Sequence, residues 1–135
     1  MAEYTGALPT PTPETKPYWD ALKEHRLLIQ RCKECQRAYF YPRPFCPRCF
    51  SFNVEWFEAS GQGKLYSFVI NHRPAPGFGP EPYVIAVVEL DEGPRMMTNL
   101  IDVEPDPDKI SCDMPVRIVY EDVTAEVTLP KFRPV

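Results

Sequence analysis

Four of the five cysteines in this 135-residue sequence form two Cys-x-x-Cys pairs, Cys32 with Cys35 and Cys46 with Cys49. A Cys-x-x-Cys turn directs two thiolates toward one point, and two such turns on neighbouring hairpins supply four sulfur ligands for a tetrahedral metal. Because four protein ligands leave no open coordination position, the spacing predicts a structural zinc site. Iron in a rubredoxin-like site is the main alternative for the same ligands.

Other residues with reactive side chains form no catalytic constellation in the sequence. Cys112 is isolated, so we expect an inert thiol. His72 follows an expected strand, but no carboxylate or nucleophile stands at a fixed spacing from it, which favours the polar rim of a binding cleft over a general base. Phosphate-loop, dinucleotide-binding and hydrolase motifs are absent. The sequence therefore favours a binding module over an enzyme.

Charge is distributed unevenly along the chain. The net charge is −4, but residues 23–50 carry seven lysine and arginine residues against two glutamates, a local balance of +5 that leaves −9 for the rest. Four thiolates around a divalent metal contribute about −2, so part of this excess neutralises the metal site. The remainder predicts an anion-binding patch, and the acidic balance elsewhere argues against nucleic acid as the ligand.

No targeting or membrane-spanning segment is visible. The sequence does not start with a basic segment followed by an apolar run, and no stretch approaches ~18 consecutive apolar residues. Paired cysteines of this kind suit a reducing compartment, where they bind metal and do not form disulfides. We therefore expect a cytoplasmic protein that does not enter a membrane.

The first 53 residues are expected to form an arm, a helix and a metal-binding ribbon. Alternating prolines in residues 1–14 favour an extended arm. In residues 15–27, Thr15 and Pro17 predict the start of a short helix, and apolar residues follow at helical spacing, at Tyr18, Trp19 and Leu22. These apolar side chains are expected either to pack on the chain's own ribbon or to dock another protein.

Residues 28–53 contain both cysteine pairs and short apolar runs at 27–30, 38–41 and 50–52, which we expect to be the strands of the ribbon. A segment of ~25 residues cannot bury enough apolar surface to order itself, so metal binding should supply most of its folding free energy. Six aromatic residues between positions 39 and 52 exceed what such a ribbon can cover. Some of them must pack on a neighbouring module or stay exposed as a binding face.

Residues 54–135 change to period-two alternation and predict five to six short strands. The expected strands cover residues 54–59, 63–71, 83–90, 95–101, 116–120 and 123–129. Five strands in ~80 residues fit a small antiparallel OB-fold barrel, with an SH3-like barrel as the main alternative. Residues 74–82 hold four prolines and two glycines, too long a connection for a tight hairpin, and should form a lip over one barrel face.

The order of these features resembles the DUF35 family of zinc-ribbon plus OB-fold proteins. The segments that carry the resemblance are Pro17-Tyr-Trp-Asp-Ala-Leu22, Leu28-Ile-Gln-Arg-Cys32, the two cysteine pairs, Glu55-Trp56, Ser60-Gly-Gln-Gly-Lys-Leu-Tyr-Ser67, Pro82-Tyr83, Val88-Glu-Leu-Asp-Glu-Gly-Pro94, Met114-Pro-Val116 and Leu129-Pro-Lys-Phe132. The resemblance covers about residues 15–135 and implies a mainly β protein with a short N-terminal helix, a rubredoxin-like zinc ribbon and an OB-fold barrel.

What the resemblance implies about function is a role in acyl-coenzyme A metabolism, of lipids or isoprenoids. Family members resemble acyl-CoA-binding accessory or scaffold subunits that associate with thiolase-like enzymes, enoyl-CoA hydratases or aldolases, so the chemistry would take place in the partner. An arginine patch is the candidate for the coenzyme's phosphates, namely Arg31, Arg37, Arg43 and Arg48. The candidates for the ligand on the barrel and lip are Tyr66, Asn71, His72, Arg73, Phe78 and Tyr83.

The sequence departs from the family pattern at two turns. Gln36 stands where many such ribbons have glycine, and Ser111-Cys112-Asp113 replaces the usual glycine before Met114. Because a non-glycine residue resists positive φ, we expect the second departure to alter the turn that enters the last strands. The alternative function is a single-stranded nucleic-acid-binding module, since zinc ribbons and OB barrels both present basic and aromatic faces to single strands.

Overall fold

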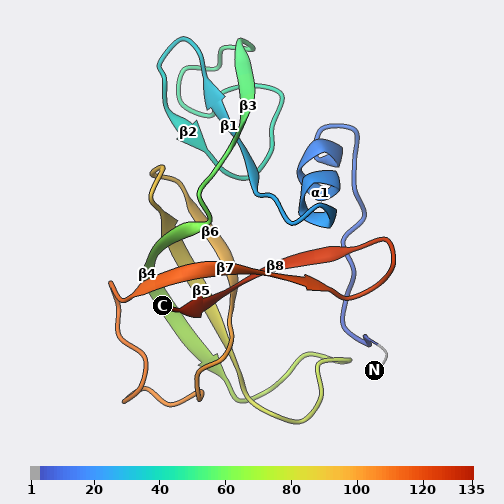
Figure 1. The fold of residues 1–135 in the computed structure, drawn as a ribbon, viewed down its shortest axis with the longest axis vertical. Coiled ribbons are helices and arrows are strands. Elements are labelled where there is room, and N and C mark those ends of the chain that lie inside the picture. Colours follow the sequence, from blue (N-terminus) through green and yellow to red (C-terminus); the bar gives the residue numbers. More distant parts are fainter. Residues whose placement is uncertain (1–3) are drawn as a thin grey trace.

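The computed structural model describes residues 4–135 and contains two sheets joined end to end (Figure 1). The ribbon at one end is a three-stranded sheet in the order β2-β1-β3, formed by β1 (Leu28–Cys32), β2 (Ala38–Tyr39) and β3 (Val54–Glu58). The other end is a closed five-stranded barrel. Its strands are β4 (Gln62–Asn71), β5 (Tyr83–Leu90), β6 (Arg95–Leu100), β7 (Pro115–Asp122) and β8 (Thr128–Pro134). The single helix of the described residues, α1 (Lys16–Lys23), lies beside the junction.

The barrel has the strand order of an OB-fold. Its order is β4-β5-β6-β8-β7, so the last two strands exchange places, and β6 meets β8 in parallel through Leu100 and Phe132. All the other neighbouring strands of the barrel are antiparallel. The predicted fold class, a short helix followed by a zinc ribbon and an OB-type barrel, is confirmed, with five barrel strands.

Three of the predicted strands need correction. Residues 54–59 were expected in the barrel, but β3 pairs with β1 over five residues, from Leu28 with Glu58 to Cys32 with Val54, and so belongs to the ribbon. Residues 50–52 form no strand, because Phe50 adopts a left-handed φ of +62° that ends extended pairing. The last strand begins at Thr128, not Val123, since residues 123–127 close the β7–β8 hairpin.

The helix, the ribbon and the barrel share one hydrophobic core. Tyr18 and Leu22 of α1 are 2% and 0% exposed and belong to the same buried cluster as Ile29 of β1 and Leu65 and Phe132 of the barrel. The apolar face of α1 therefore packs inside the chain, on both the ribbon and the barrel. Because the packing is shared, the three parts hold one another in a fixed arrangement.

A Schellman turn ends the helix and ties it to β7. The N–H groups of His25 and Arg26 donate to the carbonyl oxygens of Leu22 and Ala21, at 2.9 and 3.0 Å, and His25 adopts φ +57°. The imidazole of His25 then stacks on Tyr120, with ring centroids 5.1 Å apart, and its Nε2 lies 3.1 Å from the Asp122 carboxylate. Hydrogen bonds from Thr128 and from His25 lower the pKa of Asp122.

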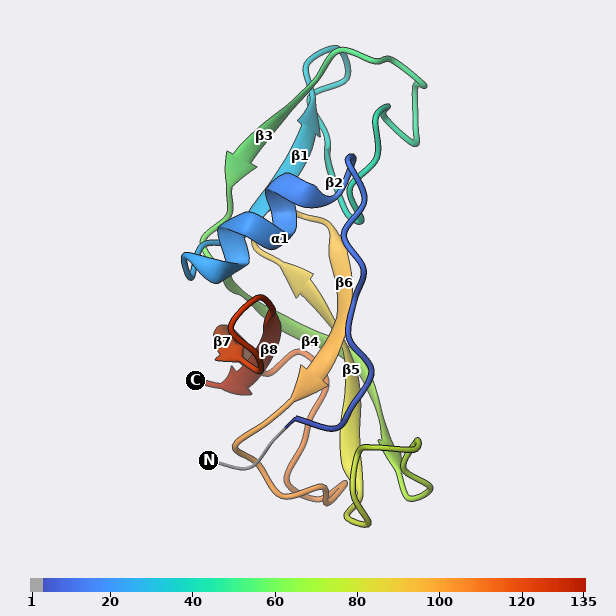
Figure 2. The ribbon, with the colours of Figure 1, turned by 90° about the vertical axis from the view of Figure 1, so that its right-hand side faces the viewer.

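The N-terminal arm reaches the lip that follows β4. The Thr5 hydroxyl donates to the Gly77 carbonyl, and Tyr4 packs edge-on against Phe78 with ring centroids 6.5 Å apart. Figure 2 shows the arm passing from α1 along the length of the barrel. Between its two ends the arm borders the β7–β8 hairpin, where Leu8 and Val127 line the same hollow. In the part of the chain that the structure describes, no helix has the length and apolar character needed to span a membrane.

We predict that Gly63→Ala destabilises the barrel. A Cβ at Gly63 would lie 2.4 Å from the Glu89 carbonyl oxygen, a backbone atom of the paired strand β5, so the two strands would have to separate. The expected cost is up to about 3 kcal/mol. Gly79→Ala is the control, because no atom lies within 4 Å of a Cβ built at this position. Its only expected cost, about 1 kcal/mol, comes from placing alanine at a φ of +78°. Thermal and urea unfolding measure both; equal losses of stability would contradict the close-approach explanation.

Candidate metal centre and binding surfaces

The four paired cysteines converge on one point. Their sulfur atoms all lie within 4.8 Å of one another, with Cys32 Sγ 3.5 Å from Cys49 Sγ and Cys35 Sγ 3.7 Å from Cys46 Sγ. Four sulfurs placed ~2.3 Å from a tetrahedral metal would be about 3.8 Å apart, so the cluster fits such an ion. Cys32 and Cys46 are buried and the other two lie at the surface.

Backbone amides around the cluster favour the thiolate form. The N–H of Cys35 donates to Cys32 Sγ and the N–H of Arg48 donates to Cys46 Sγ, each at 3.4 Å. Hydrogen bonding from the backbone, from Cys49 first, lowers the pKa of Cys46 to about 6. The pKa of Cys32 is lowered in the same way, chiefly by the backbone of Cys35. The two buried cysteines are thus favoured as thiolates, which suits metal binding. At Cys49 the backbone of Ser51 lowers the pKa, but hydrogen bonds with Cys32 and the other cysteines outweigh it and raise the pKa to about 11.

Both cysteine pairs are followed by a left-handed residue. Gln36 has φ +61° and Phe50 has φ +62°, each directly after the second cysteine of its pair. The backbone therefore needs at position 36 the conformation for which glycine is best suited. Asp113 likewise adopts φ +71°, and its N–H donates to the Leu65 carbonyl at 2.6 Å. The turn before Met114 thus takes the left-handed geometry with an aspartate, a residue that tolerates it.

The four candidate phosphate-binding arginines differ in their surroundings. Arg31 is engaged, since its guanidinium lies 3.2 Å from Glu55 and 4.4 Å from the centroid of the Phe57 ring. Arg37, Arg43 and Arg48 are exposed and take part in no ion pair found among residues 4–135. Of these, Arg48 lines a hollow between the ribbon and the barrel.

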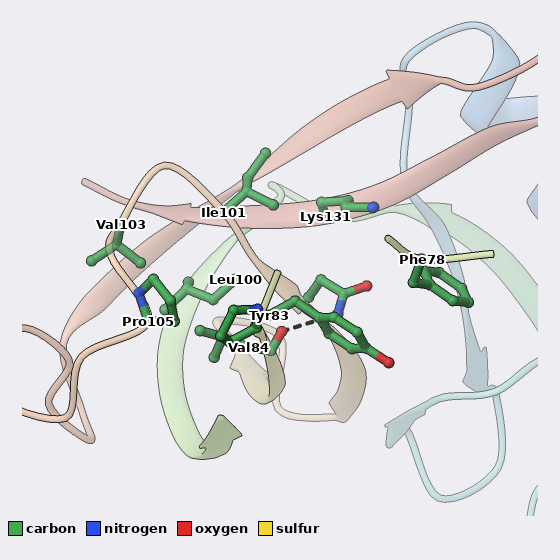
Figure 3. A pocket seen from close by; sticks show the side chains of 10 residues that line it. Phe78, Tyr83, Val84, Leu100, Ile101, Val103, Pro105 and Lys131 are labelled. Atoms are coloured by element: carbon green, nitrogen blue, oxygen red, sulfur yellow. Dashed lines mark hydrogen bonds between the residues drawn. The ribbon is translucent and has the colours of Figure 1, made fainter. Parts of the chain in front are cut away.

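The six predicted ligand-binding residues on the barrel and lip also differ in their surroundings. Phe78 and Tyr83 line a hollow of about 260 Å³ under the lip (Figure 3), and the amide of Asn71 donates to the Tyr83 hydroxyl at 3.0 Å. His72 and Arg73 are exposed and line none of the hollows found in the described part of the chain. Tyr66, on a bulge of β4, lies under the guanidinium of Arg95, 3.7 Å from the ring centroid.

Both halves of the chain match models of known protein families. Residues 19–55 match the family model "ChsH2, rubredoxin-like zinc ribbon domain", and residues 56–121 match "ChsH2, C-terminal OB-fold domain". A DUF35 domain-containing scaffold protein of Methanothermobacter thermautotrophicus is 32% identical over 116 residues, which cover 84% of this chain and 86% of that protein. This chain belongs to the DUF35 family.

Two further comparisons match this chain to part of a longer subunit and to a chain of a solved structure. A probable enoyl-CoA hydratase alpha subunit of Thermomonospora curvata is 44% identical over 117 residues, which cover 87% of this chain but 36% of that subunit. The chain therefore spans about a third of the length of that relative. A solved structure titled "Ltp2-ChsH2(DUF35) aldolase" contains a chain that is 41% identical, with a TM-score of 0.83, covering 94% of this chain and 98% of that one.

Several residues that line the hollows of this DUF35 chain were not among the sequence candidates. Lys131 and Asn99 both line the hollow under the lip and a second one of about 370 Å³ beside α1, while Arg95 lines the hollow between ribbon and barrel together with Arg48. Signals for them were present in the period-two run of β6 and in the Leu129–Phe132 motif. Without the pairing of the strands, neither signal indicates a hollow.

We predict that Cys46→Ser removes the metal and unfolds the ribbon, because the site loses a buried thiolate and the ribbon depends on the ion for its order. Metal content per chain and amide NMR spectra of residues 28–58 measure the effect. Cys112→Ser is the matched control, since Cys112 is an exposed cysteine outside the cluster. Equal metal content and unchanged ribbon spectra in Cys46→Ser would refute the structural role of the site.

Proposed function

We propose that this DUF35 chain is an accessory subunit of an acyl-CoA enzyme of the thiolase, hydratase or aldolase type, and that it binds acyl-CoA. The observation that carries the proposal is the near-complete match, over 94% of this chain, with a chain of the Ltp2-ChsH2(DUF35) aldolase. A match of this extent, at 41% identity, supports an equivalent role as a subunit beside a larger enzyme.

The names of other relatives support the same kind of partner. They include a 3-oxo-4,17-pregnadiene-20-carboxyl-CoA hydratase alpha subunit of Mycobacterium tuberculosis, 36% identical over 114 residues, and benzoylsuccinyl-CoA thiolase subunit BbsA of Thauera aromatica, 33% identical over 88 residues. Each of these protein names includes the name of a coenzyme A thioester. The shared element across hydratase and thiolase relatives is thus the thioester and not one reaction.

The chemistry of the hollows suits a thioester of coenzyme A. Arg48 and Arg95 offer planar guanidinium groups, which bind phosphates by paired hydrogen bonds. Trp19, Phe40 and Tyr41 offer aromatic surface for a ring or an alkyl chain. This combination of cations and aromatic rings is what a ligand with a phosphorylated end and an apolar end requires.

We propose zinc as the metal of the cysteine site, with a structural role. Four sulfur donors in a closed arrangement are typical of structural zinc, and residues 19–55 match a zinc ribbon model. Reduced, paired thiols of this kind are maintained in the cytoplasm, which is the compartment we propose for the protein.

Capture of the tagged chain from its native host tests the subunit role. We expect wild-type protein to enrich a thiolase-, hydratase- or aldolase-type enzyme, and the purified enzyme to turn over its acyl-CoA at least about tenfold faster with the chain than without it, because the chain completes the complex. The matched control is Cys46→Ser, whose ribbon we expect to be unfolded. Turnover by the isolated chain, or salt-sensitive capture of oligonucleotides in place of an acyl-CoA enzyme, would contradict the proposal.

A further inference from the structure

The outward face of β6 runs past three hollows in succession. Burial alternates along β6, with Met96, Thr98 and Leu100 facing the barrel interior. The opposite face presents Arg95, Met97 and Asn99, and Ile101 follows directly after the strand. Because a strand rises ~3.3 Å per residue, the four outward side chains span about 20 Å. Figure 2 shows β6 running lengthwise from the ribbon side of the barrel toward the opposite end.

The first hollow, of about 500 Å³, is cationic and lies between the ribbon and the barrel. Its ribbon wall carries Arg48, whose backbone N–H is bonded to Cys46 Sγ, and its barrel wall carries Arg95. The Arg95 guanidinium is held in place by the Tyr66 ring and by Glu89, at 3.2 Å. Glu89 also lies 3.9 Å from Lys64, so its negative charge is already shared between two cations. The hollow therefore keeps a positive balance that suits phosphate.

The second hollow, of about 370 Å³, is aromatic and adjoins the first at Phe40, which lines both. Tyr18 of α1 contacts Phe40 and Trp19, with ring centroids 5.5 and 4.9 Å apart. Met97 forms the β6 side of this hollow and is 71% exposed, which is a high exposure for a large apolar side chain. Aromatic rings and a flexible thioether provide a surface for a flat ring or a methylene chain.

Lys131 and Asn99 stand where the second hollow meets the third. The Lys131 side chain is 15% exposed, and its only ion-pair partner among the described residues is Glu121, at 3.5 Å. The Thr98 hydroxyl donates to the carbonyl oxygen of Pro130, the residue before Lys131, at 2.9 Å. The side-chain amide of Asn99 donates to the carbonyl oxygen of Val84 at 3.0 Å. A sheltered ammonium at an apolar junction is a suitable donor to a carbonyl oxygen of a ligand.

The third hollow, of about 260 Å³, is the one under the lip (Figure 3). Ile101, Val103 and Phe78 contribute apolar surface to its lining, and Asn99 and Lys131 add polar groups. The lip that carries Phe78 is held by the N-terminal arm through Thr5 and Tyr4. The hollow with the two arginines therefore lies at one end of β6, and the two hollows beyond it are lined mainly by apolar side chains.

We propose that the outward face of β6 is the floor of one continuous ligand track, which binds an acyl-CoA lengthwise with its phosphates between Arg48 and Arg95 and its acyl chain beyond Lys131. This inference rests on the proposed acyl-CoA binding and adds the direction of the ligand and the residues that set it. The acyl chain, at the lip end, is then selected by Phe78 and Val103.

Calorimetry of the full, metal-loaded chain with coenzyme A and with octanoyl-CoA tests the direction. We expect octanoyl-CoA to bind more tightly than coenzyme A. Arg95→Met should weaken both ligands at least about tenfold, because it removes a phosphate contact common to both. Val103→Asp and Phe78→Ala should weaken octanoyl-CoA toward the affinity of coenzyme A and leave coenzyme A unchanged. Lys131→Met should weaken octanoyl-CoA more than coenzyme A.

The matched control is Arg117→Met, the same substitution at an exposed position of β7 that lines none of the hollows found in residues 4–135. It should leave both affinities unchanged, and thermal unfolding checks that every variant is folded. Tryptophan fluorescence gives an independent readout, since Trp19 lines the second hollow whereas Trp56 lies on β3. Ligand should change the emission in Trp56→Phe but not in Trp19→Phe.

Two results separate failure of the track from failure of the proposed function. In the first result, octanoyl-CoA binds, but Arg95→Met lowers only the extra affinity of octanoyl-CoA over coenzyme A, or none of the track variants changes either affinity. The track is then wrong, while acyl-CoA binding stands. If wild-type chain binds neither coenzyme A nor octanoyl-CoA, the proposed acyl-CoA binding fails and the track fails with it.

Discussion

Convergence of four sulfur atoms on one point is the constraint on which the ribbon depends. Strand β2 has two residues, and the loops around it hold Gln36 and Phe50 in left-handed conformations that cost roughly 1–2 kcal/mol each. Structural zinc in small ribbons contributes on the order of 10–16 kcal/mol, enough to offset both. The chain adopts these two conformations because the turns must place Cys35 and Cys49 at the same metal site as Cys32 and Cys46.

The second constraint is the core that the ribbon shares with the rest of the chain. Tyr18 packs on Phe40 of the ribbon, while Leu22 belongs to the same buried cluster as Phe132 of β8. The metal site therefore fixes the ribbon internally, and α1 fixes the ribbon on the barrel. Both of the hollows that involve Phe40 lie along this junction, so their shape depends on the two constraints together.

Local features of the fold were predictable from the sequence because they depend on local patterns. Cysteine spacing predicted the metal cluster, and period-two alternation located most of the strands. Alternation identifies a strand but not its neighbour, which is why β3 was assigned to the barrel although it pairs with β1. The same limit applies to the hollows: His72 and Arg73 were chosen for their chemistry and stay a prediction, whereas only the strand pairing shows that Lys131 and Asn99 line the same two hollows.

The net charge of a sequence segment likewise does not show which charged side chains lie together in the folded chain. The +5 balance of residues 23–50 suggested a patch confined to the ribbon. In the folded chain, Arg26 and Arg31 are paired with glutamates, which removes them from that balance. Arg48 instead lines the same hollow as Arg95, a residue of the acidic part of the sequence. The hollow that we propose for phosphate is lined by one arginine of each module, so it exists only when the ribbon is folded and packed on the barrel. The integrity of the metal site and the proposed anion binding are therefore physically linked.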